Sequence, residues 1–243
     1  MILKRSFDIF FSLLGLMLLS PLLLVCMFLV WKQDRYSPFY IAERVGLNGK
    51  IFKMIKLRSM IKNADKSGVD STSADDTRIT KVGHFIRQYK IDEISQLFNV
   101  LKGDMTIVGP RPNVKRETDL YTTEEKELLT VRPGITDFAS IVFSDEGEIL
   151  KPYDDPDIAY NQLIRPWKSK LGLFYIENRT ICLDIQLIFL TALAIVSKER
   201  ALQGVESLLK KRVTDSELVR VSTRKDKLVP TPPPGSLEIV VQR

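Results

Sequence analysis

Cysteine and histidine are almost absent from this chain of 243 residues, which has two cysteines and one histidine. They are too few for the Cys/His spacing of a zinc site. Cys26 lies in an apolar run and Cys182 far from it, which argues against a disulfide framework and favours a reducing compartment. His84 is expected to be an ordinary helix residue. With a single histidine, catalysis by a histidine acid–base pair or a catalytic triad is therefore a poor expectation for this chain.

The chain also lacks the platform of interleaved aromatic and basic residues that nucleic-acid binders use. It is nevertheless basic, with a formal net charge of +6 and a pI near 9.2. Such a charge favours anionic partners, namely lipid headgroups, nucleotides or nucleic acid. Because the platform is missing, we expect no nucleic acid among the partners.

Charge is absent from one long apolar run, Ile9–Trp31, which is long enough to cross a bilayer core of about 30 Å. A signal peptide fits poorly because no small-residue cleavage site follows. Pro21, preceded by Ser20, interrupts the middle of the run. Basic residues flank both ends: Lys4, Arg5, Lys32 and Arg35. Two structures fit equally well on these grounds, a kinked spanning helix and a helix broken at Ser20-Pro21 that re-enters the same membrane face.

Two adjacent carboxylates, Asp92 and Glu93, stand at the start of a predicted amphipathic helix. Its apolar stripe is Ile94, Leu97, Phe98 and Leu101. At or near the N-cap, Asp92 would be kept ionised by free backbone N–H groups and the helix dipole. It could serve as a nucleophile or a metal ligand, or it could simply cap the helix. The surrounding cations are either ordinary surface ion pairs or parts of a diphosphate site: Arg78, Lys81, Arg87, Lys90, Arg111 and Lys115.

The remaining pattern predicts a mixture of short elements. Residues 39–61 read as a β-hairpin that turns at Gly46 and Asn48-Gly49, with Phe52, Met54, Lys56 and Arg58 on one strand face. Helices are expected at 82–89 and 124–130, and an irregular acidic segment at 145–157. The apolar segment 185–196 is too short to span, so it is either a core helix or an interfacial helix beside Trp167 and Lys168; we favour the interfacial position.

The C-terminal end differs in composition from the rest. It is charged and helical in pattern to about Val221, and a proline cluster at 230–235 predicts a stiff extended linker. Residues 237–241 could form a tail strand that pairs with a second copy of the chain. A homo-oligomer through this tail is therefore one expectation.

Several motifs, in this order, resemble those of the bacterial sugar transferases, the monotopic polyprenyl-phosphate phosphoglycosyl transferases of the small catalytic type. The motifs are Phe52–Met60, Asp76–Gly83, Asp92–Met105, Val108–Pro112 and Arg132–Thr136. The resemblance covers roughly residues 3–200. Three positions depart from the family pattern, with Ser95 in place of a proline, Asp137 in place of a glycine and Ser140 near a usual glutamine. The nucleophile is unaffected by these changes, but they leave the sugar preference open.

The resemblance implies a two-step transfer at the cytoplasmic face of a bacterial inner membrane. Asp92 attacks the β-phosphorus of a UDP-sugar, UMP leaves, and a polyprenyl (undecaprenyl) phosphate takes the phosphosugar from the aspartate. Mg²⁺ would neutralise the diphosphate, with Asp92 and Glu93 as its protein ligands. The expected substrate contacts are Arg87 and Arg111, the latter fixed by Pro110 and Pro112, and in second rank Lys56, Arg58, Arg78 and Arg132. This transfer would be the first membrane step of glycoconjugate or polysaccharide assembly.

The expected fold is a membrane-associated, monotopic α/β protein. Residues 1–35 would form the re-entrant membrane helix, which the resemblance favours over a spanning one. Residues 36–204 would form a mostly helical cytosolic catalytic domain with a small β-hairpin and interfacial amphipathic helices, and residues 205–243 a charged helix and proline-rich tail. The alternative function is a non-catalytic, membrane-tethered scaffold of a glycan assembly complex.

Overall fold

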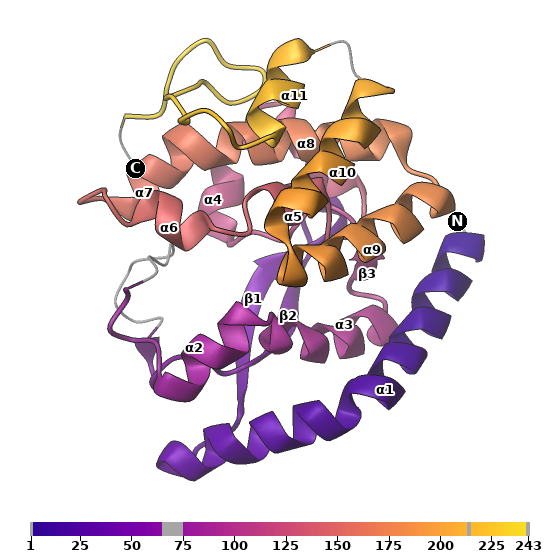
Figure 1. Ribbon diagram of the computed structural model, residues 1–243, viewed down its shortest axis with the longest axis vertical. Coiled ribbons are helices and arrows are strands. Elements are labelled where there is room, and N and C mark those ends of the chain that lie inside the picture. Colours follow the sequence, from indigo (N-terminus) through magenta and orange to yellow (C-terminus); the bar gives the residue numbers. More distant parts are fainter. Residues whose placement is uncertain (1, 65–74, 213–214, 242–243) are drawn as a thin grey trace.

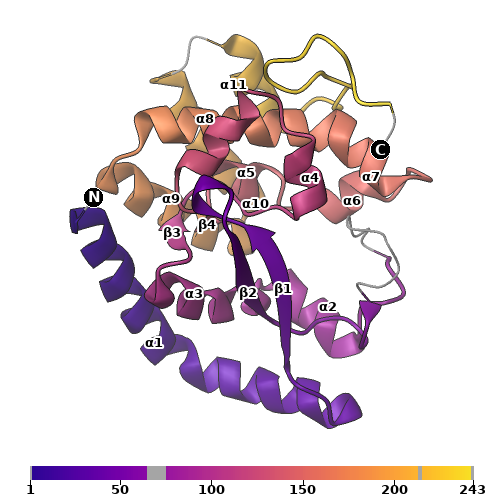
Figure 2. The same ribbon diagram turned by 180° about the vertical axis from the view of Figure 1, so that it is seen from behind.

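The computed structural model describes residues 2–64, 75–212 and 215–241 (Figures 1 and 2). Helices dominate, and two small two-stranded sheets lie among them. The expected combination of a mostly helical domain with a β-hairpin and one long apolar N-terminal helix is confirmed. The N-terminal half contains α1 (Ile2–Asp34), β1 (Phe39–Val45), the 3₁₀ turn η1 (Leu47–Gly49), β2 (Ile51–Leu57), α2 (Lys81–Gln88), the 3₁₀ turn η3 (Ile91–Gln96), α3 (Leu97–Lys102) and β3 (Thr106–Val108).

The C-terminal half is almost entirely helical. Its elements are α4 (Lys115–Asp119), the 3₁₀ turn η4 (Glu125–Thr130), β4 (Gly134–Thr136), α5 (Phe138–Val142), α6 (Glu146–Leu150), α7 (Pro156–Ala159), the π-turn η5 (Tyr160–Ile164), α8 (Arg165–Asn178), α9 (Ile181–Val196), α10 (Lys198–Lys210) and α11 (Ser216–Ser222). The segment 145–157, expected to be irregular, contains α6 and the start of α7. The division expected at 204/205 stays a prediction, and α10 runs across it.

Helix α1 is one continuous helix whose axis bends part-way along its length (Figures 1 and 2). The expected break into two helices at Ser20-Pro21 is therefore wrong for the backbone. Pro21 has no N–H to donate to the Met17 carbonyl four residues earlier. The Ser20 hydroxyl donates to that same carbonyl over 3.1 Å. This hydroxyl satisfies the acceptor that proline frees, which is why the helix bends without ending.

Both halves of α1 pack against the same globular body. Near its start, Arg5 donates to the carbonyls of Val100 (2.5 Å) and Leu101 (2.7 Å) at the end of α3. The buried Asp8 carboxylate accepts from the Thr106 hydroxyl (2.7 Å) and the Ile107 N–H (3.2 Å). Further along, Leu23, Cys26 and Val30 form a buried cluster with Leu57, Ile86 and Ile91. The helix is thus an integral layer of the fold.

The outer face of α1 is apolar and exposed, and the helix is long and apolar enough to cross a membrane. Large side chains on this face include Phe10, Leu13, Met17, Leu18, Leu24, Val25 and Phe28. Helix α9 also leaves Ile185, Phe189 and Val196 exposed while burying Leu187 and Leu190. A contact of 2.7 Å between Lys4 Nζ and Asp184 Oδ2 joins the two helices. An exposed apolar surface shared by α1 and α9 is compatible with a membrane-anchored domain.

The β-hairpin expected at 39–61 is confirmed, because β1 and β2 pair antiparallel with Ala42 opposite Met54. Its turn has Asn48 at φ 55° and Gly49 at φ 76°, the left-handed region that these two residues tolerate best. Strands β3 and β4 pair in parallel through Thr106–Gly134 and Val108–Thr136. The hairpin and this short parallel pair are the frame on which the polar site described below is assembled.

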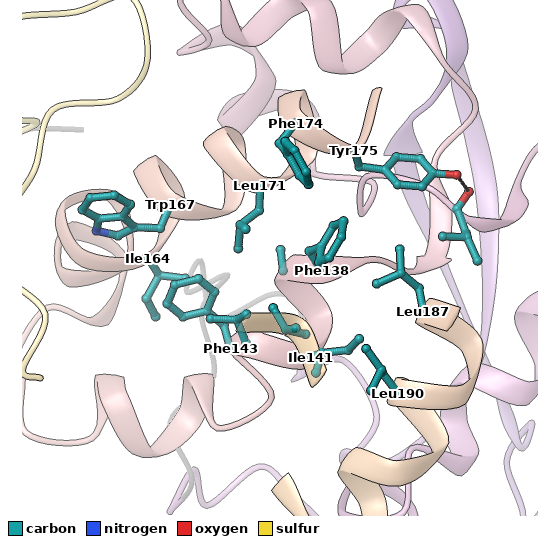
Figure 3. Packing of buried hydrophobic residues seen from close by; sticks show 14 of the residues in the cluster. Phe138, Ile141, Phe143, Ile164, Trp167, Leu171, Phe174, Tyr175, Leu187 and Leu190 are labelled. Carbon is teal, nitrogen blue, oxygen red and sulfur yellow. Dashed lines mark hydrogen bonds between the residues drawn. The ribbon is translucent and has the colours of Figure 1, made fainter. Parts of the chain in front are cut away.

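The main hydrophobic core surrounds α5 (Figure 3). Phe138 and Ile141 of α5 lie among Trp167 and Leu171 from α8 and Leu187 from α9, all almost completely buried. Burial of each of these large side chains is worth about 1.5–3 kcal/mol. The Tyr175 hydroxyl donates to the Val108 carbonyl over 2.9 Å, which ties α8 to β3. The core therefore fixes α5 and β3, both of which border the site.

Residues 237–241 form no strand with the other described residues, and their pairing with a second copy of the chain stays a prediction. The tail runs along the domain surface instead. The Thr231 N–H donates to the backbone carbonyl of Gln162 (3.0 Å), and the side-chain amide of Gln162 donates to the Val240 carbonyl (2.8 Å). The Thr122 hydroxyl donates to the Pro234 carbonyl. Prolines cannot donate to a strand ladder, so an extended segment held through its carbonyls is the expected result.

The turn that contains Asp92 is docked onto strand β2 by two buried polar side chains. Asn99 of α3 donates to the Lys53 carbonyl (2.7 Å) and accepts from the Ile55 N–H (2.9 Å). The Ser95 hydroxyl of η3 lies within hydrogen-bond distance of the Ile55 carbonyl (3.2 Å) and the Asp92 carbonyl (3.0 Å). These bonds replace the strand partner that β2 lacks on this edge.

We predict that Asn99→Ala lowers the unfolding free energy by about 1–2 kcal/mol, because it leaves a partly buried backbone donor and acceptor of β2 without partners. Circular dichroism in detergent should show a fall of the thermal midpoint by roughly 2–8 °C. Asn178→Ala is the matched control, since among the described residues this amide bonds only to the Phe174 carbonyl of its own helix. Equal thermal midpoints for the two variants would show that the Asn99 side chain does not stabilise the contact between α3 and β2.

Candidate functional site

Asp92 lies in the first turn of η3, where its carboxylate is buried and paired with a lysine from the hairpin. The N-cap of η3 is Lys90, at φ 53° in the left-handed region, so Asp92 is two residues inside the turn. The sequence analysis placed Asp92 correctly near a helix start, although this turn is 3₁₀ and the α-helix begins only at Leu97. The Asp92 Oδ2 atom is 3.3 Å from Lys56 Nζ. Lys56 reaches it because β2 is docked directly behind the turn.

Glu93, the next residue, forms an ion pair with Arg111. The distance between Glu93 Oε1 and an Arg111 guanidinium nitrogen is 2.6 Å. Burial alone would raise the pKa of Glu93, but the positive charges of Arg111, Lys90 and Lys56 lower it from 4.5 to about 2. The same pair raises the pKa of Arg111. Glu93 is therefore fully ionised at neutral pH and compensates a cluster of cations.

Arg111 is held in place by the short parallel sheet. The Gly109 N–H donates to the Thr136 carbonyl (3.0 Å), and the Gly134 N–H donates to the Pro110 carbonyl (2.9 Å). Gly134 has no room for a side chain, since a Cβ atom there would lie 2.2 Å from the Gly109 nitrogen. This close approach brings the Pro-Arg-Pro segment against β4. With prolines on both sides, the Arg111 backbone has little freedom left to lose on binding a ligand.

Two lysines complete the charged cluster. Burial lowers the pKa of Lys56 despite the opposing charge of Asp92, and the positive charges of Arg111 and Arg87 lower it further. Burial likewise lowers the pKa of Lys90, against the opposing charge of Glu93. Lys90 Nζ donates to the Ser140 carbonyl over 3.2 Å. Two carboxylates and at least three cations thus share one partly buried site, an arrangement suited to binding phosphates.

The other predicted contacts divide into two groups. Arg87 is exposed on α2, near enough for its charge to act on Lys56. The remaining three arginines donate hydrogen bonds elsewhere. Arg58 donates to both Asp34 carboxylate oxygens, and Arg78 donates to Asp76 and to the Ala64 carbonyl. Arg132 donates to the Gly103 carbonyl. The structure therefore groups Lys56, Arg87 and Arg111 with the carboxylates. Arg58, Arg78 and Arg132 brace loops and helix ends.

Sequence reasoning named Asp137 and Ser140 only as departures from the family pattern, and it missed their capping box and Glu146. Asp137 and Ser140 form a capping box at the start of α5, and the spacing Asp-x-x-Ser before an apolar run could have revealed it. Glu146 forms an ion pair with Lys168, and its negative charge helps to raise the pKa of Arg111. The Glu146–Lys168 pair joins α6 to α8, which are far apart in the sequence, so no local sequence pattern predicts it.

The donor set around Asp92 and Glu93 fits a sparsely coordinated magnesium site. No group of three or more His, Cys, Asp or Glu side chains suited to a metal occurs in the part of the chain that the structure describes. Asp92 Oδ1 and Glu93 Oε2 have no hydrogen-bond partner within that part. Mg²⁺ is often held by one or two carboxylates together with substrate phosphates and water. Two adjacent carboxylates with one available oxygen each meet that requirement.

A family model described as bacterial sugar transferase matches residues 1–198, which include every residue of this site. The chain belongs to the bacterial sugar transferase family. The motif resemblance in the sequence is thereby confirmed. The residues of the exposed apolar face of α1 and α9 and those of the charged site all lie within this matched range.

Curated relatives of this sugar transferase include the exopolysaccharide production protein ExoY of Sinorhizobium fredii, 34% identical over 207 residues that cover 79% of this chain and 84% of that protein. A UDP-N-acetylgalactosamine-undecaprenyl-phosphate N-acetylgalactosaminephosphotransferase of Aeromonas hydrophila is 32% identical over 80% of this chain. An undecaprenyl-phosphate glucose phosphotransferase of Komagataeibacter xylinus is 37% identical over 77% of this chain. The matches span only 44% and 35% of the latter two proteins.

The Glu93–Arg111 pair predicts a specific acid sensitivity. The folded-state pKa of Glu93 is lowered from 4.5 to about 2, so the stabilisation it provides is complete above pH 4.5 and is lost as the pH falls through 2. We expect the wild-type unfolding free energy to drop by about 3 kcal/mol more between pH 6 and pH 2 than that of Glu93→Gln.

The measurement is denaturant unfolding at a series of pH values, with the exposed Glu127→Gln as control. The control should follow the wild-type curve throughout. Parallel curves for wild type and Glu93→Gln would contradict a strongly coupled Glu93.

Proposed function

We propose that this sugar transferase moves a phosphosugar from a UDP-sugar to a membrane polyprenyl phosphate, releasing UMP. The observation that carries the proposal is the buried Asp92, paired with Lys56 and flanked by the Glu93–Arg111 pair, in a chain of this family. The names of the Aeromonas and Komagataeibacter relatives specify undecaprenyl-phosphate acceptors, which supports a lipid phosphate as acceptor here. The product would begin the assembly of a bacterial polysaccharide or glycoconjugate.

The chemistry divides into two displacements at the β-phosphorus. In the first, Asp92 Oδ1, which has no partner among the described residues, forms a bond to phosphorus while the bond to the bridging oxygen breaks and UMP leaves. In the second, an oxygen of the lipid phosphate attacks the same phosphorus and the carboxylate is released. Separate displacements keep the two phosphate substrates from having to meet directly, which their charges oppose.

The surrounding residues have distinct roles in this proposal. Arg111 and the exposed Arg87 bind nucleotide phosphate oxygens, and Lys56 orients the Asp92 carboxylate through its Oδ2 atom. Asp92 and Glu93 would hold Mg²⁺, which when bound neutralises diphosphate charge. Glu93 also keeps Arg111 in position while no nucleotide is bound.

The proposed membrane arrangement is re-entrant, with α1 dipping into one leaflet and returning. The supporting observation is that both ends of α1 contact one globular body, through Arg5 with α3 and through Val30 with Ile91. A straight spanning helix would place these ends on opposite sides of the membrane. In the re-entrant arrangement the site lies at the cytoplasmic surface of the inner membrane, where a soluble UDP-sugar and a lipid phosphate can meet.

We predict that Asp92→Asn abolishes UMP release from UDP-sugars in the presence of Mg²⁺ and polyprenyl phosphate, with a loss of at least a thousandfold. The amide cannot act as the nucleophile, although it keeps the size of the carboxylate. Intact mass spectrometry without acceptor should show a phosphosugar adduct on the wild type and none on the variant. Asp119→Asn, at an exposed position on α4, is the control and should retain activity. Undiminished turnover by Asp92→Asn would refute Asp92 as the nucleophile. Binding of UDP-sugars by the wild type without UMP release would favour the alternative function, a non-catalytic membrane-tethered scaffold.

We predict that both flanks of α1 react with an impermeant thiol reagent from the same side of sealed vesicles. Cysteines are introduced at the exposed positions Leu3 and Tyr36, in a background where Cys26→Ala and Cys182→Ser remove the native thiols. A third variant, Lys126→Cys, marks the side of the globular domain. All three positions should label together. Labelling of positions 3 and 36 from opposite sides would overturn the re-entrant arrangement.

A further inference from the structure

Asp137, which follows β4 and caps α5, has a carboxylate oxygen that the fold does not use. The residue is only 2% exposed. Its Oδ1 atom accepts from the Ser140 N–H (2.7 Å) and from the Ser140 hydroxyl, which closes the capping box. Its Oδ2 atom has no hydrogen-bond partner among residues 2–64, 75–212 and 215–241. One oxygen is therefore structural and the other is not accounted for.

The capping role does not explain an aspartate here. Serine, threonine or asparagine caps a helix about as well with a single oxygen and without a charge. A buried carboxylate is costly unless donors surround it. Burial raises the pKa of Asp137, which the hydrogen bonds from Ser140 and the positive charges of Lys168 and Arg111 oppose. Of these cations Arg111 belongs to the site, so the Asp137 carboxylate lies within the electrostatic field of one site residue.

Contacts connect this corner of α5 to the turn that carries Asp92. Lys90, two residues before Asp92, donates through Nζ to the Ser140 carbonyl over 3.2 Å, and Ser140 is the residue that closes the Asp137 capping box. Arg111, paired with Glu93, acts on Asp137 through its charge. The Asp137–Ser140 corner is therefore joined to the turn that carries Asp92 through the side chain of Lys90.

A sugar bound for the proposed reaction has to lie close to Asp92. Its anomeric oxygen is bonded to the β-phosphorus, so the ring lies within one or two bonds of the atom that Asp92 attacks. Sugar rings present hydroxyl or amide donors along their rim, and an ionised carboxylate is purely an acceptor. Arg111 and Lys56 supply donors for phosphate oxygens, whereas Asp137 supplies an acceptor that phosphates do not need.

We propose that Asp137 is a specificity-determining residue, whose second carboxylate oxygen accepts a hydrogen bond from a hydroxyl or N–H group on the sugar ring of the donor nucleotide. The inference rests on the proposed function for the identity of the ligand. It assigns Asp137 to sugar binding and gives it no part in the displacement at phosphorus. A sugar that covers this oxygen without donating to it leaves the acceptor unpaired, so the site would discriminate against sugars whose donor group points elsewhere or is missing.

The test compares three donors, UDP-glucose, UDP-galactose and UDP-N-acetylgalactosamine, which differ only at C4 and C2. The variant Asp137→Asn keeps the capping oxygen but presents an NH₂ donor where the second oxygen was. Asp137→Ser keeps the cap and removes the second oxygen altogether. Asp155→Asn is the matched control, because Asp155 caps α7 in the same manner at an exposed position.

In wild type we expect kcat/KM for the preferred sugar to exceed that for the poorest by about tenfold or more. Both Asp137 variants should reduce this ratio at least fivefold, mainly through KM for the preferred donor, and Asp155→Asn should leave it unchanged. If both variants slow all three donors by the same factor, or leave the ratio as in wild type, Asp137 is only a structural cap and the proposal is wrong. Thermal midpoints identify a variant that fails to fold, in which case the other variant decides.

A binding measurement separates this inference from the proposed function. Calorimetry with the same three nucleotides is performed on Asp92→Asn protein with and without Asp137→Asn, so that no turnover is required. A sugar preference in binding that depends on Asp137 supports the inference, whether or not the wild type releases UMP. If the wild type shows this preference but releases no UMP, the proposed function alone is refuted. Turnover by the wild type with binding that ignores Asp137 would overturn the inference alone. Absence of binding to any of the three nucleotides would overturn both.

Discussion

Two adjacent ion pairs, Asp92–Lys56 and Glu93–Arg111, are the constraint on which the site depends. Each partner is at least partly withdrawn from water, which costs several kcal/mol per charge unless a counter-charge is close. The pairs also connect three separate segments, since Lys56 comes from β2, the carboxylates from η3 and Arg111 from the loop after β3. Removal of any one partner leaves a charge uncompensated. The segments are thus held together by the same charges that would bind a diphosphate.

The apolar helix α1 is coupled physically to this cluster. Arg5 bonds to the last carbonyls of α3, where a cation is favoured by the helix dipole. Val30 shares a buried cluster with Ile91, the residue before Asp92. The turn that carries the carboxylates is therefore clamped between a membrane-compatible helix and strand β2. This placement suits a reaction in which one substrate is soluble and the other is dissolved in lipid. It also makes α1 a part of the catalytic fold and more than an anchor.

Much of this arrangement could be predicted from local pattern. The hairpin, the short helix before Asp92 and the pairing of Pro110 and Pro112 around Arg111 all follow from turn residues, periodicity and backbone restriction. Partners that lie far apart in sequence could not be predicted. Asn99 looks like an ordinary helix residue until β2 is seen behind it, and nothing in the tail sequence indicates that the Val240 carbonyl bonds to Gln162. Periodicity reports which face of an element is buried, and it does not report what lies opposite.

The most direct test of the account is the stereochemical course at the β-phosphorus of the donor. A UDP-sugar is prepared as a single diastereomer in which sulfur replaces one non-bridging β-oxygen, and the configuration of the lipid-linked product is determined by ³¹P NMR. Each in-line displacement inverts phosphorus, so two successive displacements through Asp92 predict net retention. Net inversion would mean that the lipid phosphate attacks the nucleotide directly, and Asp92 would then have no covalent role.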